Sequence, residues 1–154
     1  MIIDKELMKP SIFGMFDGLT TLLGVFIPLL SYTHLLVFFT CIGLAVSSSL
    51  SMGLGDYLSS DKDLSKRLRL KSAVYMALFT GFGCLVPVIP FAFIGGLPSL
   101  VVSLAIYLAL TFVVAYMKSA DMGWKESLQQ TFTVTALAVI IVVAVTLLLP
   151  IPAA

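Results

Sequence analysis

The chain has 154 residues, of which 60% are hydrophobic and 11% are charged, and its formal net charge is +1. A soluble domain carries about 25% charged residues, so this composition excludes a soluble globular protein. The length and the mean hydropathy of +1.12 predict one membrane domain over residues 1–154.

Five apolar runs are each long enough for the roughly 20 residues that a spanning helix needs. They cover residues 11–31, 34–58, 72–94, 97–117 and 129–149. The runs lack the alternation of a β-barrel, and a lone sheet would leave unpaired edges in lipid. We therefore predict an all-α bundle of five transmembrane helices. The first run is too long for a signal sequence and has no cleavage site behind it, so we expect it to be retained.

The nine basic residues fall into three clusters, which precede the first run, join the second to the third, and join the fourth to the fifth. Alternate crossings place all three clusters on one side, which the positive-inside rule assigns to the cytoplasm. We therefore expect a cytoplasmic N-terminus, an outside C-terminus and a multi-pass protein, in the plasma membrane if the cell is prokaryotic. The basic segment 60–71 is either a solvated loop or a short helical extension that touches anionic lipid.

Asp17 lies inside the first apolar run, where an acid costs about 2.5 to 3.5 kcal/mol and needs a functional reason. Helical spacing places it on one small and polar face with Gly14, Thr21 and Gly24.

The second run carries a comparable stripe at a spacing of four residues, formed by Ser48, Met52 (or Ser51) and Asp56 (or Gly55), with Tyr57 next along the chain. Counting from Pro10 and Ser60 predicts that Asp17, Met52 and Asp56 share one depth near the cytoplasmic side.

A carboxylate and a thioether together suit a borderline divalent ion such as Fe²⁺ or Mn²⁺. An acid at this depth can also exchange a proton against a cation. We therefore identify Asp17, Met52 and Asp56 as candidate metal ligands, and Thr21, Ser48 and Tyr57 as candidate lining of the path.

No nucleotide-binding loop, nucleophile triad or HExxH pattern is present in the sequence. Cys41 and Cys84 stand alone in apolar runs, as buried free thiols do, and His34 falls in a short outer connection. We therefore expect no enzyme activity, no bound cofactor and no nucleic-acid partner.

Three segments resemble the vacuolar iron transporter and yeast vacuolar calcium/iron carrier family. They are Ile12-Phe-Gly-Met-Phe-Asp-Gly-Leu-Thr-Thr21, Ser51-Met-Gly-Leu-Gly-Asp-Tyr-Leu-Ser59 and Pro87-Val-Ile-Pro-Phe91. The resemblance implies a homodimer that moves Fe²⁺, and in some members Mn²⁺, out of the cytosol in exchange for protons between the two first helices.

Carried over by position, the resemblance makes Asp17 the transport-path aspartate and Met52 the methionine of the second helix. Asp56 stands where the family more often has glutamate. Residues 60–71 are too short and too basic for the glutamate-rich insert of plant-type members, so the chain resembles a minimal member.

Two other functions fit the same sequence. A non-transporting membrane scaffold would use the small stripes for packing alone, and it would tolerate Asp17→Asn. A small-molecule/proton exporter would protect cells against lipophilic cations rather than metals.

Overall fold

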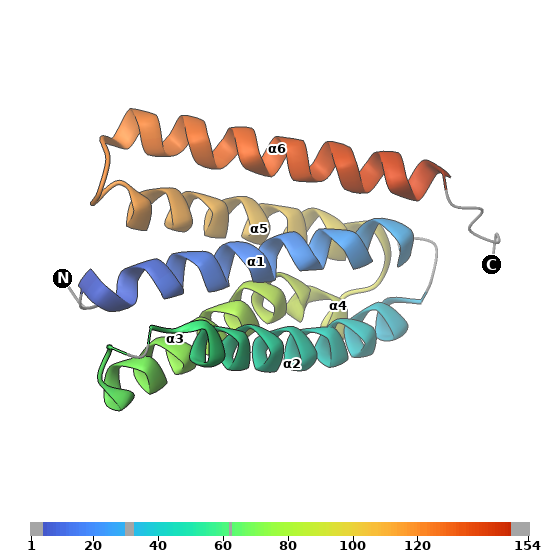
Figure 1. Cartoon of the computed structure of the whole chain (residues 1–154). Helices are drawn as coiled ribbons and strands as arrows, with labels where there is room; N and C mark the ends of the chain where they lie inside the picture. Colours follow the sequence, from blue (N-terminus) through green and yellow to red (C-terminus); the bar gives the residue numbers. More distant parts are fainter. Residues whose placement is uncertain (1–4, 30–32, 62, 149–154) are drawn as a thin grey trace.

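The computed structural model describes residues 5–29, 33–61 and 63–148 (Figure 1). Within these ranges the fold is helical and contains no strand, which confirms the all-α prediction. The elements are α1 (Lys5–Leu29), α2 (His34–Ser59), α3 (Lys66–Leu85), the 3₁₀ turn η1 (Val86–Val88), α4 (Ile89–Phe93), α5 (Gly96–Lys118) and α6 (Trp124–Leu148).

Four of the five predicted spans are confirmed as helices long and apolar enough to cross a membrane: His34–Ser59, Lys66–Phe93, Gly96–Lys118 and Trp124–Leu148. Helix α1 is also long, and it carries Asp17 together with Glu6 and Lys9 near its start. Its 25 residues run beside the other helices along the bundle (Figure 1). It is not among the four helices identified as candidate membrane spans, so the first span stays a prediction. The predicted ends at residues 30–31 and 149 lie outside the described residues.

The third predicted span is interrupted near its end. Pro87 lies in η1 and Pro90 in α4, and each lacks the backbone N–H that a continuous helix would use.

The connections between the helices are also shorter than the sequence predicted. Helix α3 begins at Lys66, after Ser65 accepts a hydrogen bond from the Leu68 backbone, so half of segment 60–71 is helical.

Helix α1 forms the centre of the bundle and packs most closely on α3. Met15, Leu19 and Leu23 of α1 form one buried cluster with apolar residues of α5. Leu22 and Phe26 join a second cluster with residues of α2, η1 and α4. Since α1 is enclosed by protein on most sides, its environment depends less on lipid than that of the outer helices.

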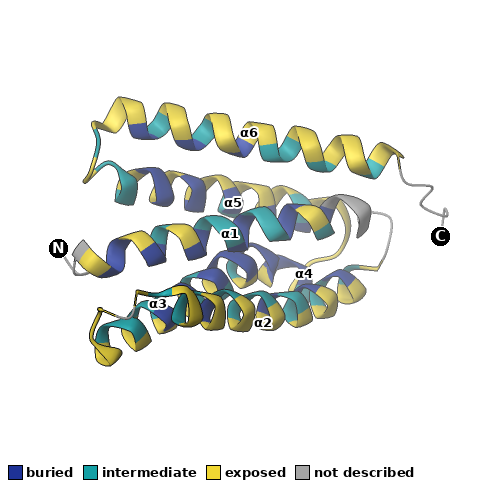
Figure 2. Cartoon of the chain, in the orientation of Figure 1, coloured by how far each residue is buried: buried dark blue, intermediate teal, exposed yellow. Residues whose placement is uncertain are grey.

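The outward faces of the helices are exposed (Figure 2), and many of the exposed side chains there are large and apolar. Leu108 and Phe112 of α5 and Ile140 and Ile141 of α6 are each about half exposed, as expected where lipid is the solvent. The start of α1, the α2–α3 connection and the α5–α6 connection lie together at one end of the bundle (Figure 1). We call this the charged end, because the described basic residues gather there.

Candidate metal-transport site

The Asp17 carboxylate lies half-buried on α1, against α2. The hydroxyl of Ser48 donates a hydrogen bond to its Oδ2 atom across the two helices, at 3.2 Å. These two residues are 31 positions apart in the chain, and both belong to the predicted set. The tertiary structure therefore joins one candidate ligand to one candidate lining residue.

Met52 and Asp56 lie one and two helical turns from Ser48, toward the charged end, and both are half-buried. At 1.5 Å per residue, Asp56 is about 12 Å along α2 from the level of Asp17. The predicted common depth of Asp17, Met52 and Asp56 is therefore wrong. Helix α1 starts at Lys5 and continues through Pro10, so Pro10 was a poor marker of its end.

Asp56 has an unusual environment of its own. Its Oδ2 atom is fully enclosed and has no hydrogen-bond partner among the described residues. Its backbone carbonyl accepts hydrogen bonds from the backbone and the hydroxyl of Ser60, at 3.0 and 2.6 Å, where α2 ends. An enclosed carboxylate oxygen without a donor is costly, so a bound cation would stabilise it.

The other two lining candidates differ in their surroundings. Tyr57 contacts α3, because the Arg69 guanidinium lies 4.9 Å from its ring centre and donates to its backbone carbonyl at 2.9 Å. Arg69 was missed as a site neighbour, although its place in the basic segment after α2 was a usable signal. Thr21 is half-buried on α1, one turn beyond Asp17.

The sequence pattern predicted one shared face for the small residues of α1, but in the structure they lie at different interfaces. Gly14 and Gly18 contact α3, where a Cβ atom at either position would meet the backbone carbonyl of Met76 or Thr80. At Gly24, by contrast, no atom of the residues that the structure describes lies within 4 Å of such a Cβ position. The Gly14-x-x-x-Gly18 spacing, a known packing signal, could have revealed this division.

The residues of α2 that pack on α3 are also next to the predicted stripe and are not part of it. Gly53 contacts Ala73 and Ala77 of α3, and the Ser49 hydroxyl lies against Gly81. Ser48, Met52 and Asp56 are therefore left at the edge of the α2–α3 contact. This position allows Ser48 to reach α1.

One face of α1 is uncovered. It carries Phe13, which is 57% exposed, the half-buried Asp17 and Thr20, and the exposed Gly24. Among the described residues, no three His, Cys, Asp or Glu side chains gather into a cluster that could hold a metal ion. The arrangement in one chain is thus an acid and a hydroxyl at mid-helix, with a second acid nearer the charged end.

Residues 8–68 of the chain match the VIT family, which comprises membrane transporters of metal ions such as iron and manganese rather than enzymes. The match covers most of α1, all of α2 and the start of α3, and it includes each candidate site residue. It agrees with the family resemblance drawn from the sequence, and the four long apolar helices make the chain a multi-pass membrane protein. No curated protein and no solved structure matches the chain.

Proposed function

We propose, from the family match over the two helices that carry the candidate site, that the protein exports Fe²⁺ or Mn²⁺ from the cytosol in exchange for protons. The hydrogen-bonded pair of Asp17 and Ser48 is the observation that carries the proposal. It places an acid with one fixed hydroxyl between two helices of an apolar bundle. The charged end then faces the cytoplasm, by the positive-inside rule.

The candidate residues would act one after another, from the charged end inward. Asp56, nearest the charged end, would attract the cation at the mouth of the path with its unpartnered carboxylate oxygen. Met52, one turn further in, would supply a soft sulfur ligand, and Asp17 would supply a hard one. Asp17 would bind either the cation or a proton, which links the two movements.

A second copy of the chain would complete the site. A carboxylate and a hydroxyl are fewer ligands than a divalent ion such as Mn²⁺ takes, and a two-fold axis would double them. The uncovered face of α1 supports this arrangement, because Gly24 and Thr20 would allow a second helix to approach closely. We therefore propose a homodimer in which the two α1 helices face each other.

The test uses purified protein in liposomes with an imposed proton gradient, and it compares uptake of Fe²⁺, Mn²⁺, Co²⁺, Zn²⁺ and Ca²⁺. The native protein should move Fe²⁺ or Mn²⁺ and carry protons in the opposite direction. Asp17→Asn should abolish both fluxes, since the amide has no charge to neutralise the cation. Asp61→Asn is the matched control, because Asp61 is exposed in the α2–α3 connection.

Two results would contradict the proposal. If no metal moves and Asp17→Asn assembles normally without phenotype, the scaffold interpretation is correct. If metals do not move but lipophilic cations do, the protein is a small-molecule/proton exporter. Flux of metal that is insensitive to Asp17→Asn would refute the assigned site while keeping the transport function.

A further inference from the structure

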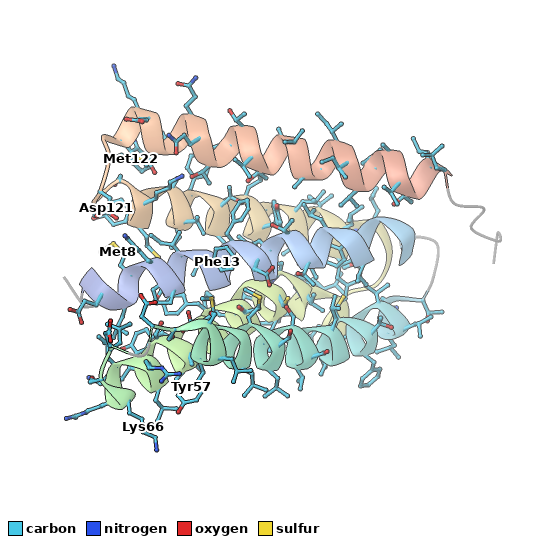
Figure 3. All side chains as sticks on the ribbon, in the orientation of Figure 1. Met8, Phe13, Tyr57, Lys66, Asp121 and Met122 are labelled. Carbon is cyan, nitrogen blue, oxygen red and sulfur yellow. The ribbon has the colours of Figure 1, made fainter. Side chains whose placement is uncertain are left out.

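A second site-like feature lies away from Asp17, where α1, α5 and α6 face one another at the charged end. It is a cavity of about 370 Å³, open to the surface. Its walls are mainly apolar and include Ile12, Phe13 and Phe16 of α1, Val114 of α5 and Val134 of α6. Figure 3 shows Phe13 on α1, and Asp121 and Met122 in the α5–α6 turn at this end.

One polar group in the wall has no partner. Thr131 is only 4% exposed, and its hydroxyl makes no hydrogen bond among the described residues. Thr131 lines the cavity, but its hydroxyl oxygen is itself enclosed, so the side chain would have to turn toward the cavity to donate to a ligand. A buried hydroxyl without a partner is unfavourable, so an occupant with an acceptor oxygen at this point would be favoured.

The rim of the cavity is charged, with a positive excess. Lys9 and Lys118 contribute two positive charges and Asp121 one negative charge, which leaves a net charge of +1. Lys118 donates one hydrogen bond to Gln130 at 2.9 Å, and Gln130 in turn donates to Glu126 at 3.3 Å. The lysine ammonium retains two further protons for a ligand.

An aromatic pair marks the level of this rim in the membrane. The rings of Tyr116 and Trp124 meet edge to face with their centres 6.3 Å apart, at the end of α5 and the start of α6. Both are exposed, and exposed Trp and Tyr of membrane helices sit at the headgroup level. Thr131 is seven residues further along α6, about 10 Å deeper. The lysines therefore lie near the headgroups, and the apolar walls lie near the acyl chains.

We propose that this cavity binds one anionic phospholipid of the cytoplasmic leaflet, with a hydroxyl-bearing headgroup such as that of phosphatidylglycerol. Lys9 and Lys118 bind the phosphodiester, and a headgroup hydroxyl donates to Asp121. Thr131 turns to donate to an ester oxygen below them, and the acyl chain follows Ile12, Phe16 and Val134. The positive rim does not suit a divalent cation, so this site is separate from the transport path.

The test is native mass spectrometry of the full chain purified in detergent, with phosphatidylglycerol, phosphatidylcholine or inorganic phosphate added. One phosphatidylglycerol should be retained per chain, in preference to phosphatidylcholine, and inorganic phosphate should neither bind nor compete. Each lysine removed should weaken retention about fivefold, and Lys9→Gln with Lys118→Gln about 30-fold, from a typical contribution of one lysine at an anionic surface.

Two further variants make the assignment specific. Thr131→Val keeps the side-chain shape and should weaken retention without unfolding the protein. Lys125→Gln removes an exposed charge of α6 outside the cavity lining and should leave retention unchanged.

Equal retention of phosphatidylcholine would overturn the proposal, as would undiminished retention in the double lysine variant. The double lysine variant could also become a monomer while it retains phosphatidylglycerol as before. This result would show that the two lysines hold a second copy of the chain, and not a lipid, at the cavity. Lipid binding does not depend on metal transport, so a failure of one proposal leaves the other standing.

Discussion

Replacing Gly18 by alanine tests the close approach of α1 and α3 directly. The added Cβ would fall on the Thr80 carbonyl oxygen, well inside contact distance, and 3.0 Å from the Cys84 backbone nitrogen. Because both neighbours are backbone atoms of a packed helix, the two helices must move apart. The same movement would weaken the hydrogen bond that the Cys84 thiol donates to the Gly18 carbonyl, now 3.1 Å long.

Two opposing effects set the magnitude. Overpacking of this kind costs about 1 to 3 kcal/mol, and a backbone obstacle places Gly18→Ala at the upper end. Alanine in place of glycine within a helix stabilises by about 0.5 to 1 kcal/mol. We therefore expect a net loss of about 2 to 2.5 kcal/mol for Gly18→Ala.

The assay is unfolding of the purified protein by SDS in mixed micelles, followed by circular dichroism. The matched control is Gly43→Ala, because a Cβ at Gly43 of α2 would meet no atom of the described part of the chain within 4 Å. This control should be neutral or more stable than the native protein, by the propensity gain alone. If Gly18→Ala unfolds at the same SDS fraction as Gly43→Ala, the inferred α1–α3 contact is wrong.

Three further changes probe other contacts. Arg69→Met removes a hydrogen bond to the end of α2 and the cation contact with the Tyr57 ring, so thermal unfolding in detergent should show a loss of about 1 to 2 kcal/mol. Ser127→Ala removes the hydrogen bond from α6 to an α5 backbone carbonyl, and a loss of about 0.6 kcal/mol in SDS unfolding is expected, whereas a loss near zero would show that the bond is absent in lipid. Gly24→Leu should dissociate the proposed dimer in light scattering while the thermal unfolding of the subunit stays unchanged, because no atom of the described residues lies within 4 Å of a Cβ at that position; an intact dimer would place the interface elsewhere.

The residues of the candidate site could be found from the sequence, but their relative positions could not. Asp17 stands out because an acid in an apolar run has an energetic cost that its neighbours do not share. The bond from Ser48 to Asp17 could not be predicted, because it depends on how far α1 extends beyond Pro10. The unpartnered Asp56 oxygen depends on the packing around the end of α2.

The sequence by itself determined the class of the protein, the position of four long apolar helices along the chain and the grouping of the basic residues at one end. These features follow from the length of apolar runs and the high cost of charge in lipid, both of which are local properties. It also singled out Asp17 as the residue that needs a function.

Only the tertiary structure decided that α1 is the central helix, that Gly18 and Gly53 pack on α3, and that Thr131 lines a cavity with a charged rim. The physical reason is that lipid tails are as apolar as leucine, so an apolar side chain in a membrane helix does not reveal whether it faces lipid or protein. Packing of small residues makes that choice, and it becomes visible when the helices are placed together.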